Sequence, residues 1–82
     1  MWEELNNKLR KEFKFKDFIE AAAFITKVSI VSEKNNHHTE IYNIYNRVII
    51  DLCTHDQENK ITQKDYKLAE EIDKILWLIK KH

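Results

Sequence analysis

Residues 40–55 read EIYNIYNRVIIDLCTH, a stretch that is rich in β-branched and aromatic residues and is long for a single strand. Asn46 separates two apolar runs, which predicts a tight turn between strands near 41–45 and 47–54. A single bent strand is the alternative. In the two-strand interpretation, alternate residues of the second strand face the core, namely Val48, Ile50 and Leu52.

Another hairpin is predicted near the N-terminus, over residues 2–16. The letters WEEL and KLRKEFKFK flank Asn6-Asn7, and a two-residue polar turn between such arms is a hairpin signal. The second arm alternates with period two, which is typical of a half-buried strand. One face of this arm carries Leu9, Phe13 and Phe15, and the other carries Lys8, Arg10, Glu12, Lys14 and Lys16.

The sequence DFIEAAAFITKVSIVSEK, residues 17–34, predicts the first helix. Asp17 is expected to cap it, with Glu20 three residues later in an arrangement close to a capping box. Asn35-Asn36 is expected to end it, because the chain has no Gly or Pro and Asn tolerates left-handed backbone best after Gly. The apolar face is wide, which is often a sign of contact between subunits. Helical spacing is followed by Phe18, Ala21, Ala22, Ile25, Val28 and Val31.

The sequence TQKDYKLAEEIDKILWLIKKH, residues 62–82, predicts the second helix. Thr62 is expected to cap it, and Asp65 lies in the first turn, where a negative charge suits the helix dipole. The element order is then ββαββα, an α+β chain that forms one domain over residues 1–82. The buried stripe of this helix is expected to contain Tyr66, Leu68, Ala69, Ile72, Ile75, Leu76 and Ile79.

The charges of the chain balance. Lys plus Arg and Asp plus Glu each number 14 in 82 residues, so bulk charge attracts neither nucleic acid nor an anionic membrane. No apolar run is long enough to span a bilayer, and the N-terminus does not resemble a secretory signal. Cys53 is the single cysteine and is interpreted as a packing residue, which suits a reducing compartment. A cytoplasmic protein is therefore expected.

Histidines are concentrated in two stretches, EKNNHHTE at residues 33–40 and Thr54-His55-Asp56. Imidazole changes charge near neutral pH and is suited to acid–base chemistry. In an α+β sandwich, a loop that leaves a helix and the end of a central strand can lie at one rim, so convergence of His37, His38 and His55 is a hypothesis. A solvated loop is the plainer interpretation. A zinc site of three histidines is a weaker alternative, because the spacing matches no common structural zinc pattern.

Five segments in order resemble the pterin-4a-carbinolamine dehydratase family. They are F-K-F-K-D-F (13–18), Ala22 with Phe24, E-K-x-N-H-H (33–38), N-I-Y-N-R-V-I-I-D-L-C-T-H-D (43–56) and I-T-Q-K-D-Y-K-L-A-E-E-I-D (61–73). The resemblance implies a four-stranded antiparallel sheet with both helices on one face. It also implies dehydration of 4a-hydroxytetrahydropterin to quinonoid dihydropterin, a homodimer or homotetramer, and neither metal nor cofactor.

The resemblance also implies roles for individual residues. His37 and His55 would act as general acids on the two faces of the pterin, and His38 would bind and orient the substrate. Glu33 would support the site. Thr39 stands where the family usually has proline, which implies a less rigid loop. The further pocket residues, acting largely through their backbone, would be Thr39, Thr54, Asp56 and Gln57.

Two other classes of function remain open from the sequence. The same fold is used as a dimerisation or assembly module, and a domain can keep its shape while its role changes. Retention of all three histidines favours the enzyme, because an assembly module does not need them. A small nucleic-acid binder that uses Lys8, Arg10, Lys14 and Lys16 is the weaker option, since a polar outer sheet face explains them as well.

Overall fold

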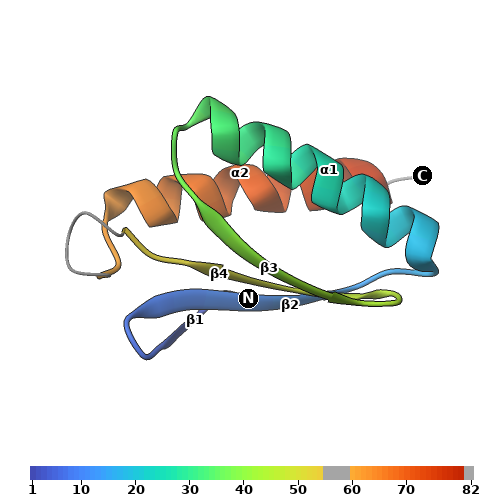
Figure 1. Ribbon diagram of the computed structural model, residues 1–82, viewed down its shortest axis with the longest axis horizontal. Helices are drawn as coiled ribbons and strands as arrows, with labels where there is room; N and C mark the ends of the chain where they lie inside the picture. Colours follow the sequence, from blue (N-terminus) through green and yellow to red (C-terminus); the bar gives the residue numbers. More distant parts are fainter. Residues whose placement is uncertain (55–59, 81–82) are drawn as a thin grey trace.

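The two predicted hairpins form one antiparallel sheet in the computed structural model, which describes residues 1–54 and 60–80 (Figure 1). Each hairpin supplies one central and one edge strand, because β2 pairs with β4 in the middle of the sheet. The strand order is β1-β2-β4-β3. The strands are β1 (Glu3–Leu5), β2 (Lys8–Lys14), β3 (Thr39–Ile44) and β4 (Arg47–Leu52).

The first hairpin turn follows the prediction. Asn6 and Asn7 both have positive φ, 49° and 64°, as a two-residue turn that matches the twist of its strands requires. The second turn contains Tyr45 as well as Asn46, and Tyr45 has a φ of 51°. The strand predicted near 41–45 therefore ends one residue earlier, at residue 44. It also begins two residues earlier, at residue 39.

The second strand of this hairpin is shorter than predicted. The prediction of 47–54 extended it by two residues, because β4 ends at Leu52. Thr54 instead forms an isolated bridge with Lys60, in which the Thr54 N–H donates to the Lys60 carbonyl at 2.9 Å. Alternation within β4 is as expected, since Val48, Ile50 and Leu52 are fully buried.

The first helix, α1, spans Phe18–Lys34. The Asp17 carboxylate caps it by accepting from the Glu20 N–H at 2.8 Å, as predicted. Glu20 in turn accepts from the Lys16 N–H at 3.1 Å, one residue before the cap. Phe18 departs from the expected apolar stripe, because it is the first residue of α1 and is 51% exposed. Phe24 is fully buried and packs against Phe13 and Phe15.

The second helix, α2, spans Gln63–Lys80 in the described residues. Thr62 caps it as predicted, since its Oγ1 accepts from the Lys64 N–H at 3.3 Å. Tyr66 was expected in the buried stripe, but it is 45% exposed. Its hydroxyl donates to the Glu4 carboxylate at 2.6 Å, and this bond raises the pKa of Tyr66 above its usual value of 10.0. The hydroxyl is thus bonded to a residue of β1 and does not enter the core.

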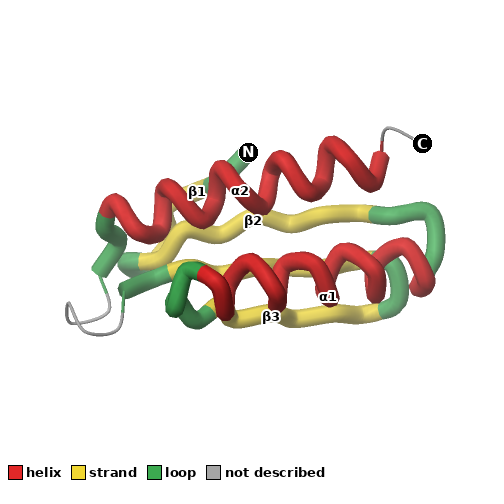
Figure 2. Tube along the Cα trace, turned by 90° about the horizontal axis from the view of Figure 1, so that it is seen from above, coloured by secondary structure: helices red, strands yellow, loops and turns green. Residues whose placement is uncertain are grey.

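Both helices lie on one face of the sheet, with α2 above the β1–β2 half and α1 above the β3 half (Figure 2). The fold therefore has the two layers that the sequence predicted. The other face carries charged pairs across neighbouring strands, including Arg10 with Asp51 at 2.7 Å. No helix within residues 1–54 and 60–80 is long and apolar enough to cross a membrane. The buried apolar residues of the core are Leu9, Phe13, Phe15, Ala21, Phe24, Val28, Val48, Ile50, Leu52, Leu68, Ala69, Ile72 and Ile75.

Candidate active site

The C-terminus of α1 places the histidine pair. Asn36 has a φ of 50°, and its N–H donates to the Glu33 carbonyl at 3.0 Å. The next N–H, that of His37, donates to the Ser32 carbonyl at 3.0 Å. These two bonds define a Schellman motif, with asparagine in the left-handed position that glycine usually occupies. The motif turns the chain sharply off the helix, so His37 points toward α2 instead of continuing along α1.

The end of α1 is also tied to α2 by a side chain. The Asn35 amide nitrogen donates to the Val31 carbonyl at 2.8 Å and to the Glu71 carboxylate at 2.7 Å. The first bond adds a second donor to the Val31 carbonyl, which also accepts from the Asn35 backbone N–H at 3.0 Å, and the second bond crosses to the neighbouring helix. The loop that carries the histidines therefore starts from a fixed point between the two helices.

His37 is paired with a buried carboxylate. Its Nε2 lies 2.5 Å from Oδ1 of Asp65, which is in the first turn of α2, and Asp65 is 0% exposed. His37 itself is 9% exposed. An ionised carboxylate only accepts hydrogen bonds, so Nε2 donates when Asp65 is ionised, and Nδ1 is then the ring nitrogen that remains. The contact with Asp65 thus fixes the orientation of the imidazole.

The second oxygen of Asp65 is held by two threonines. Oδ2 accepts from the Thr54 hydroxyl at 2.9 Å and from the Thr62 N–H at 2.8 Å. The hydroxyls of Thr54 and Thr62 also lie 2.6 Å apart. Together with the bond from Lys64 to Thr62, this forms a reciprocal capping box with aspartate in place of the usual glutamate. The Asp65 carboxylate therefore caps the start of α2, anchors Thr54 just after β4 and holds His37.

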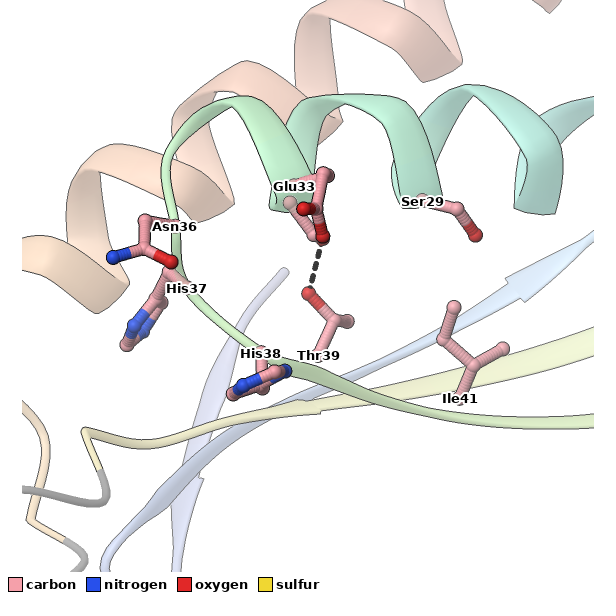
Figure 3. Close-up of a pocket in the computed structure, with 8 residues that line it drawn as sticks. Ser29, Glu33, Asn36, His37, His38, Thr39 and Ile41 are labelled. Atoms are coloured by element: carbon pink, nitrogen blue, oxygen red, sulfur yellow. Dashed lines mark hydrogen bonds between the residues drawn. The ribbon is translucent and has the colours of Figure 1, made fainter.

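A cavity of about 190 Å³ opens beside the histidine pair, between α1 and the edge strand β3. His37 and His38 lie at one end of it, and Ser29 and Ile41 lie at the other (Figure 3). Thr39 lies between the two ends, and its hydroxyl shares a hydrogen bond with the Ser32 hydroxyl. The complete lining is Ser29, Ser32, Glu33, Asn36, His37, His38, Thr39 and Ile41.

The irregular backbone that a shared pocket requires is present. Neighbouring residues of an extended chain point to opposite sides, yet His37 and His38 both line this cavity. They differ in burial, because His37 is buried against α2 whereas His38 is exposed. Thr39, which replaces the expected proline, begins β3 and is anchored to α1 by its side-chain hydrogen bond. A hydrogen bond therefore restrains the loop at this position.

Four of the sequence-predicted site residues share the cavity, and the others are placed differently. Glu33, His37, His38 and Thr39 all line it. Thr54 is buried behind Asp65 and does not line the cavity. The remaining predicted residues, His55, Asp56 and Gln57, lie outside the described residues.

Sequence reasoning missed the role of Asp65. It was interpreted as a favourable charge at a helix start, which it is, but its contact with His37 joins residues 28 apart. The available signal was the Thr-x-x-Asp spacing, which predicts a cap and says nothing about a partner outside the helix.

Within residues 1–54 and 60–80, no group of three His, Cys, Asp or Glu side chains is arranged to hold a metal ion. The zinc hypothesis also needs His55, so this finding covers only part of it.

The fold and the cavity together define a two-layer α+β protein with a histidine–carboxylate pair at the rim of its sheet. A family model described as Pterin 4 alpha carbinolamine dehydratase matches residues 1–75. A protein of the cyanobacterium Prochlorococcus marinus, assigned as a pterin-4-alpha-carbinolamine dehydratase, is 57% identical over 74 residues, which cover 90% of this chain and 76% of that protein. The chain belongs to the pterin-4a-carbinolamine dehydratase family, as its sequence indicated.

Two solved structures share the fold. One is described as a transcriptional coactivator/pterin dehydratase from Brucella melitensis; it is 38% identical, has a TM-score of 0.84, and the match covers 90% of this chain and 80% of that one. The other is a pterin dehydratase-like protein described as a RuBisCO assembly factor in the alpha-carboxysome, at 22% identity and a TM-score of 0.77, with 90% and 87% covered. At that identity the second likeness concerns the fold alone.

Proposed function

We propose that this protein is a hydro-lyase that converts 4a-hydroxytetrahydropterin to quinonoid dihydropterin and water. The observation that carries the proposal is the imidazole of His37, held at 2.5 Å by a fully buried carboxylate beside a cavity. Membership of the dehydratase family supplies the substrate class. Burying an ionisable pair costs stability, so the burial of His37 against Asp65 supports a chemical role beside the capping role of Asp65.

The reaction consists of one bond cleavage and two proton transfers. The C4a–O bond breaks, a proton is delivered to the departing hydroxyl, and the N5 proton is lost as the C4a=N5 double bond forms. Each transfer takes place near neutral pH, where imidazole is the best matched side chain. A positioned acid or base of this type is worth roughly 10²- to 10⁴-fold in rate.

The roles expected from the family are part of this proposal. His37 and His55 act as general acids, and His38 binds and orients the pterin. With Nε2 of His37 bonded to Asp65, its Nδ1 is the atom that exchanges a proton with substrate. His55 follows Thr54 in the sequence, and the Thr54 hydroxyl bonds the same carboxylate as His37, which supports a common site. Glu33 and Thr39 contact the substrate from the cavity wall, Asp56 and Gln57 complete the pocket, and Thr54 acts from behind it by holding Asp65.

A dehydration assay on enzymatically generated 4a-hydroxytetrahydropterin tests the proposal. The native chain is expected to accelerate dehydration, and His38→Ala and His55→Ala are expected to lose roughly 10²-fold or more in kcat/KM. His55→Ala should keep the circular dichroism spectrum and the oligomeric state of the native chain. His82→Ala is the matched control and should keep native activity. A His55→Ala chain that works at the native rate would show that the role given to this residue is wrong.

The proposal also includes self-association and a cytoplasmic location. Ile30 on α1 and Trp77 and Leu78 on α2 expose large apolar side chains on the helical layer. Ile30 and Leu78 line a groove of about 540 Å³ between the two helices. A second copy that packs its helical layer here would bury this surface, which supports a homodimer or homotetramer. The proposed cytoplasmic location is a reducing compartment, and it is supported by Cys53, which is a free, buried thiol.

A further inference from the structure

Two side-chain contacts join the end of α1 to α2. Both helices lie on the same face of the sheet, and α1 ends on the side of the fold where α2 begins (Figure 2). The His37 imidazole contacts the Asp65 carboxylate at 2.5 Å. The Asn35 amide nitrogen donates to the Glu71 carboxylate at 2.7 Å. Asp65 and Glu71 lie about 9 Å apart along the axis of α2, at a rise of about 1.5 Å per residue. The proposed reaction uses the first contact and leaves the second without a role.

The Asn35 side chain is a rigid link between the two helices. Its amide nitrogen carries two protons, and both are used, one for the Val31 carbonyl at 2.8 Å and one for the Glu71 carboxylate at 2.7 Å. Val31 belongs to the last part of α1, so the amide group cannot turn away from Glu71 without losing its bond to α1 as well. Asn35 and Glu71 are both half-buried, which limits competition from water. A hydrogen bond to an ionised carboxylate is also stronger than one between neutral groups.

The position of His37 depends on this link, because the loop that carries it moves with α1. The two backbone bonds of the Schellman motif attach the loop to the last turn of α1. Asp65 belongs to α2, so its distance from His37 depends on how the end of α1 lies against α2. One contact leaves the helix ends free to rotate about it, whereas a second contact displaced along α2 prevents this rotation. A shift of about 1 Å at a reacting group can cost about 10²-fold in rate.

We propose that Asn35 and Glu71 are positioning residues that hold the end of α1 against α2 and so keep His37 aligned for proton transfer. This inference rests on the proposed function, because it assigns the pair a part in the chemistry of His37. Neither Asn35 nor Glu71 lines the cavity, so an effect of the pair on turnover has to pass through the histidine loop.

Substrate binding should depend much less on this link. His38, which is assigned to bind the pterin, is followed by Thr39, whose hydroxyl is anchored to Ser32 by a separate hydrogen bond. The far side of the loop therefore keeps its own attachment to α1 when the Asn35–Glu71 bond is lost. Loss of that bond should lower kcat and kcat/KM together and change KM little, as expected for a group that acts in the transition state.

The test uses a pair of variants at Glu71 that separate the hydrogen bond from the charge. Glu71→Gln and Glu71→Met both remove the charge and keep a similar length, but only glutamine retains an oxygen that can accept from the Asn35 amide. Asn35→Ala removes the donor. Asn46→Ala is the matched control, because the Asn46 amide is also half-buried and donates to the Phe15 carbonyl at 2.8 Å but does not join the helices or line the cavity.

The measurements are kcat and KM in the dehydration assay, at a temperature where circular dichroism shows every variant to be folded. Asn35→Ala and Glu71→Met are expected to lower kcat about ten-fold and to keep KM within about two-fold of native. Glu71→Gln should stay within about three-fold of native in both values, because its hydrogen bond remains. Asn46→Ala should lower the midpoint of urea unfolding, as Asn35→Ala does, and keep native kcat.

Failure of the positioning role and failure of the proposed function give different results. An active native chain whose Asn35→Ala and Glu71→Met variants keep native kcat would overturn the positioning role alone. A fall in kcat of equal size in Glu71→Gln and Glu71→Met, or in Asn35→Ala and Asn46→Ala, would overturn it too, because charge or stability would then explain the loss. A native chain without dehydratase activity would overturn the proposed function, and the positioning role with it.

Discussion

Asp65 shows how one side chain can serve both the fold and the site. It accepts hydrogen bonds from the Thr62 N–H, the Thr54 hydroxyl and His37, and it is fully buried. A buried carboxylate is tolerated only when its lone pairs are satisfied, and here three donors from three segments do so. The position of the imidazole is therefore as well defined as the start of α2.

Replacing Asp65 with asparagine should separate its positioning role from its structural one. The amide keeps the size of the side chain but presents two N–H donors on one side, so it cannot accept from both His37 and Thr62. We expect kcat to fall at least about ten-fold, with a changed pH profile, since the imidazole loses the carboxylate that orients it. Rates from pH 5 to 9 provide the measurement.

The matched control is Asp73→Asn on the same helix. Asp73 accepts from the Trp2 indole and from Lys11, away from the cavity. This variant should lose some stability and keep the native pH profile of kcat. If both variants lower kcat to the same extent with unchanged pH profiles, Asp65 acts only through stability.

At the scale of single elements, the β3–β4 turn carries a conformation that its residue does not favour. Tyr45 has a φ of 51°, a region that costs a residue with a Cβ roughly 1–2 kcal/mol and that asparagine tolerates better. The other hairpin has Asn6-Asn7 in the equivalent turn. The Tyr45 ring is largely exposed, so little packing offsets the cost.

Tyr45→Asn should therefore stabilise the protein, by about 0.5–1 kcal/mol in the free energy of unfolding. The midpoint of urea unfolding, followed by tryptophan fluorescence, measures the change. Tyr42→Asn is the control, because Tyr42 is equally exposed but lies within β3, where asparagine is disfavoured and should lower the midpoint. A lower midpoint for Tyr45→Asn would mean that the tyrosine ring makes a favourable contact in the folded protein.

At the scale of the whole molecule, local patterns predicted the elements and their layers. Period-two alternation located the strands, and capping residues located both helix starts to within a residue. Patterns of this kind failed where a contact is made across the fold. Thr54 reads as the continuation of a strand, but it leaves β4 to reach Asp65, and Tyr66 reads as core but bonds to Glu4.

The candidate site likewise has one part that the sequence predicts and another part that only the fold reveals. The histidine pair is visible in the sequence, but without the family resemblance it reads equally as a solvated loop after the first helix. The Asp65 partner is not visible, since its link to His37 depends on where the end of α1 meets the start of α2. The Ser29–Ile41 end of the cavity is likewise formed by a helix and a strand whose facing residues only the fold brings together.

Self-association is the prediction that belongs to the complete molecule. Ile30→Lys and Leu78→Lys place charges on the exposed apolar surface of the two helices, and each should shift the native oligomer toward monomer in size-exclusion chromatography with light scattering. Leu5→Lys is the control, because Leu5 is also exposed but lies at the first hairpin. A native chain that is monomeric at micromolar concentration would contradict the expectation.

Because Asp65 both caps α2 and holds His37, the rate of turnover should report whether the first turn of α2 is intact. The first turn of a helix is the part that opens most readily, and here its closure and the aim of His37 depend on the same atoms. On heating, activity should therefore be lost a few degrees below the temperature at which the sheet unfolds. Local opening of the first turn of α2 would stop catalysis while most of the structure is still intact.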